Sequence, residues 1–588
     1  MIDAILFQIS TSYIHHNVRS ADAQLGLYYI AEYANCHDIN IKVKKYSSNE
    51  PIIANIQSLL EQYNCQIIGF YVDSENLWII RRILLELKKI YPKLFVVLGG
   101  PQVTGNPQLV LKRIPNVNCV IVGEGERPVL QIIKQIKESR LDYSTIRGVA
   151  YLNDSNDFCF TGSQTISRNL DDYPYPKRKN YTLDENIIFD QISTGRGCIG
   201  KCAFCFEGNK QENVLRLRST ENVIEEIDYV ISNLGCQKFI SFLDDTFIIN
   251  PNRTKIICNH LIEKYNGNIK WFCEARVDIL IKNLELLPLM KKAGLIRIQL
   301  GGESGNQKVL DAYNKNMQVE QLIRVVKEIK KAEIPSVYIN FIIGGALETL
   351  HTFNDTIELA KLLLEVAPGC AEVGSSIFTP YVGTPMSCNP EKYDIKVLDF
   401  DLLRGPDGFV STSETRELSE HKILQLKTIF DSEINKKVNL LLKELTKEEI
   451  LVHYQLEQEY SMATEWYNQC QRIEPFKNFF ESISHFGFCS LMGLKYEELQ
   501  ISVPHRTCQP VSDGECYLRN VAFKGYIKNT PLENAVYLLS SGKICFYEIV
   551  QILSRSEEFK NLPNIEETIY NIYKKFDNER LIVWKNNL

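Results

Sequence analysis

Three cysteines within eight positions are the residues of this chain whose type and spacing most clearly predict chemistry. Cys198, Cys202 and Cys205 follow the pattern C-x3-C-x2-C. Because three thiols at this spacing cannot share one regular helix face, we expect them on a loop that wraps one inorganic group. Soft thiolate ligands favour zinc or an iron–sulfur cluster.

The segment around the cysteines favours the iron–sulfur cluster. A zinc site usually has a fourth protein ligand, and none is obvious nearby. A 4Fe–4S cluster held by three cysteines instead leaves one iron open for a further ligand. Gly197 and Gly200 permit a tight loop, and Phe204 and Phe206 would shield the group from water. The alternative is a three-cysteine zinc knuckle with a fourth ligand distant in the sequence.

The composition is that of a large globular protein in a reducing setting. The chain has 588 residues, 45% of them hydrophobic, which predicts roughly three or four domains. Its net charge of −6 argues against a nucleic-acid binder. Neither a signal peptide nor a membrane-spanning run is recognisable, so we expect a cytoplasmic protein without a membrane partner. There, clustered cysteines indicate metal binding or catalysis, and the odd total of 17 says little about pairing.

Residues 1–150 alternate short apolar runs with helical periods, which predicts a doubly wound parallel sheet. Ligands of such sheets bind beyond the carboxyl ends of the strands, where small residues let a flat ligand approach the backbone. The residues that we expect at these ends are Ser10, Thr11, Asp73, Ser74, Gly99, Gly100, Pro101, Gly123, Glu124, Gly125 and Glu126.

Six further strand–helix units follow a linker over residues 151–185, and they predict an open parallel barrel over residues 186–390. Polar residues and glycines recur where its strands end, which is where barrel active sites form. These residues are Asp244, Asp245, Arg276, Glu303, Ser304, Gly344 and Gly345. A solvated loop charge or a helix cap is the alternative role for each carboxylate.

The cysteine motif and the units after it resemble the radical S-adenosylmethionine (SAM) superfamily. The resemblance implies that the open iron binds SAM and that the reduced cluster cleaves it to a 5′-deoxyadenosyl radical. It further implies that Asp244 or Asp245 receives the SAM ammonium group and that Arg276 holds the carboxylate. Glu303 and Ser304 would then bind the ribose or the ammonium group, and Gly344 and Gly345 would lie near the adenine.

The first 150 residues resemble the cobalamin-binding domain that precedes some radical SAM enzymes. The resemblance rests on the segments 25–27, 97–101 and 122–126. It implies cobalamin at the strand ends named above. The chain lacks an Asp-x-His-x-x-Gly segment to supply a lower axial histidine, so a domain that kept the fold and lost the ligand stays open. The other alternative is a flavodoxin-like sheet whose glycines only make turns.

Residues 391–588 carry no strong motif and are expected to be mostly helical, with helices over 418–445 and 453–472. The pattern after residue 520 resembles a winged-helix or PqqD-like module, which implies leader-peptide binding by strand addition. A plain domain that packs on the barrel is the alternative. Cys508 and Cys516 are interpreted as ordinary thiols rather than as ligands of an auxiliary cluster.

The sequence thus predicts a cobalamin-dependent radical SAM enzyme that methylates an unactivated carbon of a natural product or peptide. Its expected cofactors are a 4Fe–4S cluster, SAM and cobalamin, and the expected electron donor is a flavodoxin or ferredoxin. A non-methylating cyclase or isomerase is one alternative, and a cobalamin or iron–sulfur sensor without turnover is another. The sequence assigns no catalytic acid or base.

Overall fold

The computed structural model of the chain describes residues 2–10, 24–184, 191–209, 214–233, 239–398, 411–487, 491, 494–512 and 517–585. These residues form two compact units, Met1–Ile434 and Asn435–Leu588. The predicted boundaries at residues 150, 185 and 390 all lie inside the first unit. Within the described residues, no helix is both long and apolar enough to cross a membrane.

The amino-terminal part of the first unit is a seven-stranded sheet in the order β2-β1-β3-β4-β5-β6-β7. The first five strands are parallel, whereas β6 and β7 add an antiparallel edge beyond residue 150. The strands are β1 (Ala4–Ser10), β2 (Ile41–Ser47), β3 (Ile67–Tyr71), β4 (Phe95–Gly99), β5 (Cys119–Ile121), β6 (Val149–Leu152) and β7 (Phe158–Phe160). This arrangement confirms the predicted parallel sheet.

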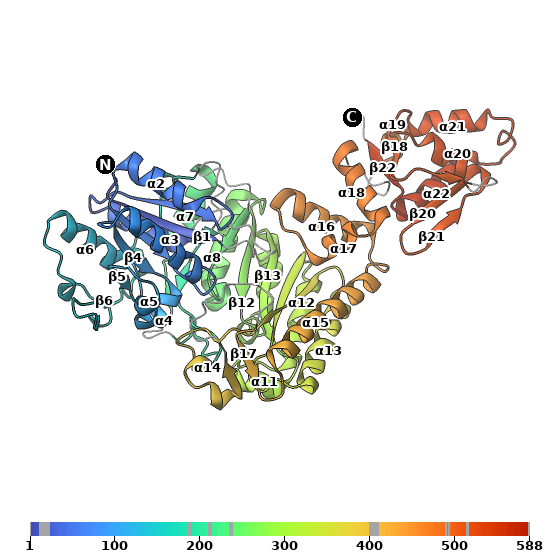
Figure 1. Cartoon of the computed structure of the whole chain (residues 1–588). Coiled ribbons are helices and arrows are strands. Elements are labelled where there is room, and N and C mark those ends of the chain that lie inside the picture. Colours follow the sequence, from blue (N-terminus) through green and yellow to red (C-terminus); the bar gives the residue numbers. More distant parts are fainter. Residues whose placement is uncertain are drawn as a thin grey trace. The chain divides into compact units, whose positions relative to one another are not determined.

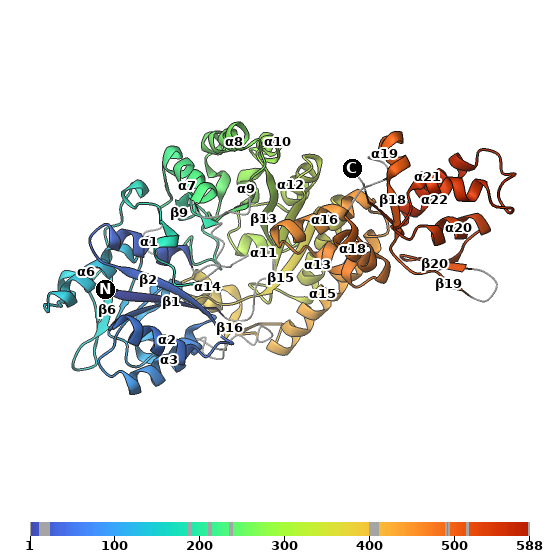
Figure 2. The same cartoon turned by 90° about the horizontal axis from the view of Figure 1, so that it is seen from above.

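Helices cover both faces of this sheet, so its central strands are apolar throughout. Figure 2 shows α1 (Leu25–Asn35) on one face and both α2 (Ile52–Tyr63) and α3 (Leu77–Ile90) on the other. The remaining helices of this part are α4 (Pro101–Gly105), α5 (Pro107–Arg113) and α6 (Glu126–Lys137). Phe7, Ile68 and Leu98 are almost fully buried in the core between sheet and helices.

The second part of the first unit is built on a six-stranded parallel sheet in the order β15-β14-β13-β12-β11-β8, as predicted (Figure 1). Its strands are β8 (Gln191–Ile192), β11 (Phe239–Phe242), β12 (Lys270–Ala275), β13 (Leu295–Glu303), β14 (Ser336–Ile343) and β15 (Ala371–Ile377). A short hairpin of β9 (Gly195–Arg196) and β10 (Arg216–Leu217) flanks the cysteine loop.

Helices follow the barrel strands in turn, as the alternation of apolar strand and amphipathic helix predicts. They are α7 (Thr220–Asn233), α8 (Pro251–Tyr265), α9 (Val277–Leu280), α10 (Leu287–Lys292), α11 (Gln307–Ala312), α12 (Val319–Lys331), α13 (Leu350–Val366) and α14 (Pro385–Cys388). A small antiparallel pair, β16 (Ile395–Val397) and β17 (Ser413–Thr415), precedes α15 (Glu420–Leu441).

One predicted helix of the second unit is two helices. Residues 453–472 are divided between α16 (Lys447–Tyr460) and α17 (Glu465–Gln471). Ser461 ends α16 with a left-handed φ of 48°, and the Thr464 side chain caps the start of α17 by accepting a hydrogen bond from the Tyr467 N–H.

The rest of the second unit packs helices around short strands. The helices are α18 (Glu474–Phe486), α19 (Tyr496–Ile501), α20 (Pro531–Leu539), α21 (Phe546–Ser554) and α22 (Ile565–Asn578). The strands are β18 (Val503–Arg506), β19 (Val511–Ser512), β20 (Tyr517–Val521), β21 (Gly525–Lys528) and β22 (Ile582–Lys585). Tyr573, Phe576 and Trp584 fill its core. The winged-helix interpretation stays a prediction, and Cys516 lies outside the described residues.

Candidate functional site

The cysteine loop begins directly after β9. Gly197 has a φ of 91°, which lets the chain turn out of the strand before Cys198. The Asn209 side-chain amide donates to the carbonyl oxygens of Cys202 and Cys205, at 2.7 and 2.8 Å. The Gly200 N–H points at the Cys198 sulfur, 3.3 Å away. The backbone of the loop is therefore fixed by its own hydrogen bonds.

The three cysteines line one cavity of about 340 Å³ at the carboxyl ends of the barrel strands. Burial raises the pKa of the Cys198 thiol and raises the pKa of Cys205 to about 11. A nearby positive group, such as the iron of a cluster, would oppose these shifts and favour the thiolates. No three His, Cys, Asp or Glu side chains of the described chain converge on a single-ion site. The three cysteines do share one cavity.

Three of the predicted SAM ligands line the same cavity, namely Asp245, Arg276 and Glu303. Asp245 lies close enough to Cys198 and Cys205 for its charge to raise the pKa of both thiols. Arg276 donates from Nη1 to the Cys202 sulfur at 3.4 Å and from Nε to Asp278 at 3.0 Å. These carboxylates and this guanidinium can meet the ammonium and carboxylate groups of an amino acid.

Glu303 is held by an ion pair within the cavity. Its Oε1 lies 2.5 Å from the Lys315 ammonium, and both side chains are buried. Glu303 has a left-handed φ of 57°, which is uncommon outside glycine. A Cβ on Gly301 would lie 2.1 Å from that same carboxylate oxygen, so only glycine leaves room for the pair.

The other predicted SAM ligands do not line this cavity. Asp244 accepts hydrogen bonds from the backbone N–H and hydroxyl of Thr194 at 3.0 and 2.8 Å, so its carboxylate holds the preceding loop. The Ser304 hydroxyl is buried and receives the Asn306 N–H at 3.1 Å. Gly344 and Gly345 follow β14, whose residues Asn340 and Ile342 line the cavity. A Cβ on Gly345 would lie 1.9 Å from the Tyr313 hydroxyl, which explains this glycine by packing.

Four polar side chains inside the barrel escaped the sequence reasoning. Glu274, Gln299, Asn340 and Ser376 come from four adjacent strands and line the cavity. Gln299 donates to Glu274 at 3.1 Å, and Ser376 bonds Asn340 at 3.2 Å. Burial raises the pKa of Glu274 to about 7, helped by the charge of Asp245. The available signal for this row was a polar residue within each of four successive predicted strands.

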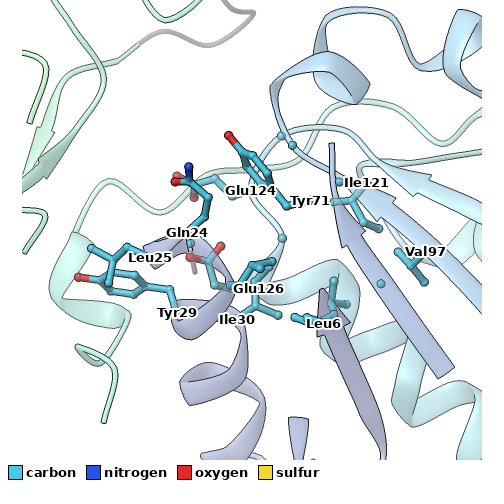
Figure 3. A pocket seen from close by; sticks show the side chains of 18 of the residues that line it. Leu6, Gln24, Leu25, Tyr29, Ile30, Tyr71, Val97, Ile121, Glu124 and Glu126 are labelled. Atoms are coloured by element: carbon cyan, nitrogen blue, oxygen red, sulfur yellow. The ribbon is translucent and has the colours of Figure 1, made fainter. Parts of the chain in front are cut away.

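A second cavity, of about 350 Å³, lies at the carboxyl ends of the amino-terminal sheet. Of the residues expected at the strand ends of this sheet, Gly99, Gly100, Gly123, Glu124, Gly125 and Glu126 line it. Figure 3 shows the apolar side chains of Leu6, Ile30, Val97 and Ile121 along one part of the cavity, with the polar ends of Gln24, Tyr71 and Glu124 gathered at another.

Glycines shape this cavity for a large ligand. A Cβ on Gly69 would lie 2.6 Å from Leu6, and Gly100 has a φ of 114° beside the backbone of Val72. Gly26 also lines the cavity, but a Cβ there would meet no atom within 4 Å. The backbone is therefore open to a flat ligand at the amino-terminal end of α1.

Other predicted cobalamin contacts lie away from this second cavity. Ser10 ends β1 and accepts the Ser48 N–H through its carbonyl, and Thr11 lies outside the described residues. Asp73 closes a turn by accepting the Asn76 N–H at 2.9 Å, and burial raises its pKa to about 6. Ser74 bonds Tyr381, which lines the cysteine cavity.

The barrel supplies one wall of the second cavity. Ser193, Arg196 and Leu243 line it together with residues of the amino-terminal sheet. Arg196 pairs with Glu124 at 3.0 Å and with Glu126 at 2.6 Å. The two cavities are thus neighbours within one compact unit, and the segment 193–198 borders both.

Two family models match the parts that hold these cavities. The radical SAM superfamily model matches residues 192–360, and the B12 binding domain model matches residues 16–133. The first defines a radical SAM enzyme, whose cofactors are a 4Fe–4S cluster and SAM. The second implies cobalamin, so the chain carries the two domains that cobalamin-dependent radical SAM enzymes combine.

Two curated relatives differ in the activity that their names give. An uncharacterized methyltransferase of Pyrococcus horikoshii is 27% identical over 378 residues, which are 63% of this chain and 79% of the relative. An anaerobic magnesium-protoporphyrin IX monomethyl ester cyclase of Rubrivivax gelatinosus is 27% identical over 304 residues. That match covers 50% of this chain and only 54% of the cyclase.

The fold extends beyond these regions. The structure of the cobalamin-dependent SAM radical enzyme OxsB, solved with aqua-cobalamin and SAM bound, superposes with a TM-score of 0.58 at 16% identity. The match covers 99% of this chain and 85% of that one. The likeness therefore includes the carboxyl-terminal region, which lies outside the residues that these two family models match.

Proposed function

We propose that this enzyme transfers a methyl group to an unactivated carbon of a small molecule or peptide. The observation that carries the proposal is the pair of neighbouring cavities bordered by one segment, with Cys198 on the first and Arg196 on the second. When bound, the cluster with SAM supplies a 5′-deoxyadenosyl radical and cobalamin supplies the methyl group. A substrate at the junction would be within reach of both.

The chain's own residues would hold and orient these groups. Cys198, Cys202 and Cys205 would ligate three irons and leave the fourth open. Asp245, beside two of the cysteines, would receive the SAM ammonium group. The Nη1 of Arg276, beside the third, is suited to the SAM carboxylate. Phe204, which also lines the cavity, would help exclude water.

Glu303, with its partner Lys315, would bind the ribose hydroxyls through its carboxylate. The row of Glu274, Gln299, Asn340 and Ser376 offers further hydrogen bonds within the cavity, to SAM or to the substrate. We propose a reduced flavodoxin or ferredoxin as the electron donor.

The first test concerns SAM cleavage. Anaerobically purified protein should contain iron and sulfide and should release 5′-deoxyadenosine from SAM once reduced. The triple variant Cys198→Ala, Cys202→Ala, Cys205→Ala should release none, whereas Cys388→Ala, at an exposed cysteine, should match the wild type. Deoxyadenosine release by the triple variant would overturn the assignment of the cluster.

The second test concerns the fate of the methyl group. A ring-forming reaction without methyl transfer is the competing function, and the cyclase relative favours it. SAM that carries a trideuterated methyl group should give a product heavier by that group. A product that forms with deoxyadenosine but without the label would favour the cyclase-type reaction. No SAM cleavage by fully loaded, reduced protein would favour a sensor.

A further inference from the structure

The segment between β8 and the first cluster cysteine belongs to both cofactor sites. Ser193 and Arg196 line the second cavity, at the amino-terminal sheet, which we call the cobalamin cavity. Cys198 lines the cysteine cavity, which we call the SAM cavity. Two adjacent groups of contacts hold this segment, one from the barrel and one from the amino-terminal sheet. We call these two groups of contacts the barrel anchor and the sheet anchor. A shift of either anchor would therefore move the backbone beside Cys198.

The barrel anchor acts on Thr194. Its N–H and hydroxyl donate to the buried carboxylate of Asp244, and its carbonyl accepts from Arg253 Nη2 at 2.6 Å. The backbone then passes Gly195, where a Cβ would lie 3.2 Å from Asp244 Oδ1 and 2.7 Å from Leu217. The contacts of Thr194 and Gly195 therefore fix the backbone at this end of the segment.

The other anchor is Arg196. Its guanidinium bridges Glu124 and Glu126, which lie on either side of Gly125 where the chain enters α6. Arg216, its partner across the β9–β10 hairpin, pairs with Glu124 at 2.5 Å, so two guanidinium groups balance two carboxylates. Glu126 is only 3% exposed and depends on Arg196 for its charge balance.

Two aromatic rings complete the surroundings of Arg196. The guanidinium carbon lies 5.0 Å from the ring centre of Tyr29 and 5.2 Å from that of Tyr173. Tyr29, Glu124 and Glu126 all line the cobalamin cavity as well. Burial alone would lower the pKa of Arg196, but the charges of Glu126 and Glu124 outweigh it and raise the pKa. The guanidinium is therefore a permanent cation on the cavity wall.

We propose that Arg196 is a positioning residue that couples cobalamin binding to the cluster loop. A ligand in the cavity would restrict Tyr29, Glu124 and Glu126, and through them Arg196, two residues before Cys198. Such coupling is reciprocal by thermodynamic necessity, so a loaded cluster must strengthen cobalamin binding by the same factor. The inference concerns binding alone and does not depend on whether a methyl group is transferred.

The test measures the dissociation constant of hydroxocobalamin by anaerobic absorbance titration, on protein with the cluster and on protein from which it has been removed. We expect binding to the cluster-loaded wild type to be tighter by at least about fivefold, the lower end of typical coupling. Iron content and circular dichroism would establish that each preparation is loaded as stated and folded.

The double variant Arg196→Met, Glu126→Met removes the ion pair without leaving a buried unpaired charge. In this variant, the ratio of the hydroxocobalamin dissociation constant without the cluster to that with the cluster should fall to about one. Arg196→Lys, which keeps the charge but cannot bridge two carboxylates, provides a second variant that is expected to fold, with an intermediate ratio. Arg127→Met is the matched control, because Arg127 lies over the same Tyr173 ring at 5.9 Å without lining the cavity.

Two results would overturn the proposal. One is a wild-type ratio of one, which would mean that the two sites bind independently. The other is a wild-type ratio that persists in both Arg196 variants, which would mean that coupling runs through other residues. Weaker cobalamin binding with an unchanged ratio would assign Arg196 to the cavity wall alone.

Discussion

The Nη1 atom of Arg276 lies 3.4 Å from the sulfur of Cys202, so a guanidinium donates a hydrogen bond to one of the three cysteines of the loop. Asp278 fixes this guanidinium through two contacts of 3.0 Å. Hydrogen bonds to the sulfurs of an iron–sulfur centre, and nearby charge, set its reduction potential.

Arg276→Met should therefore make the cluster harder to reduce and slow SAM cleavage. The loss of a charge-assisted hydrogen bond of about 1.5–3 kcal/mol predicts a decrease of about 10- to 150-fold in the rate of 5′-deoxyadenosine release. Redox titration followed by electron paramagnetic resonance would measure the shift to lower potential. Arg324→Met, at an exposed position on α12, is the control. An unchanged potential with slower cleavage would assign Arg276 to SAM binding alone.

Gly26→Phe should block the cobalamin cavity. A side chain at this position extends into open space on the cavity wall, so the phenyl group would occupy room that the ligand needs. We expect hydroxocobalamin binding to weaken by at least about tenfold, a loss of about 1.4 kcal/mol. Gly26→Ala should bind almost normally. Iron content should be the same in both variants, and equal binding by both would show that the ligand does not contact this end of α1.

SAM binding should depend on pH through Glu274. Burial raises the pKa of this carboxyl to about 7, so it gains its negative charge between about pH 6 and 8. The positive sulfonium and ammonium groups of SAM should therefore bind more tightly as the pH rises, by at most about tenfold per pH unit for one proton. Glu274→Gln should flatten the profile, as measured by equilibrium binding to cluster-loaded protein. A wild-type slope that survives in Glu274→Gln would point to another group.

The stability of the first unit should fall as the pH rises, because of Glu348. Burial raises the pKa of this carboxyl from 4.5 to about 8, although it accepts the Gly344 N–H. Between these values the folded state keeps a proton that the unfolded state has lost, so rising pH favours unfolding by at most about 1.4 kcal/mol per pH unit. Above about pH 8 the contribution levels off.

Glu348→Gln should remove this dependence and raise the melting temperature relative to the wild type at pH 8 more than at pH 5. Thermal unfolding across that range measures this difference, with Glu285→Gln at an exposed carboxylate as the control. Parallel wild-type and Glu348→Gln profiles would show that the carboxyl is solvated.

The sequence alone predicted those features that depend on residues close together in the chain. The spacing of Cys198, Cys202 and Cys205 predicted one shared site, and the glycines after β4 and β5 predicted a ligand at that edge. It left Asp244 and Asp245 unresolved, because consecutive residues at a strand end point in opposite directions and one register step decides which of them faces the cavity. The structure directs Asp244 to Thr194 and leaves Asp245 in the cavity.

Contacts between distant segments were beyond such reasoning. Arg196 and Glu126 are 70 residues apart, and no periodicity links a cysteine loop to the turn of another domain. Glu274 and Asn340 were missed for a different reason. Each is a polar residue in a strand that was predicted from its apolar residues. Because the prediction used only the apolar residues, the polar ones were not considered as candidates for the site.

The pairing of Arg196 with Glu124 and Glu126 also bears on how such proteins can be recombined. The two halves that meet here look modular in the order of the chain, yet their charges complement each other across the junction. A chimera that takes its first half from a relative would inherit foreign partners for Arg196. Exchange of the first half should therefore succeed only when the residue two places before the first cluster cysteine is exchanged with it.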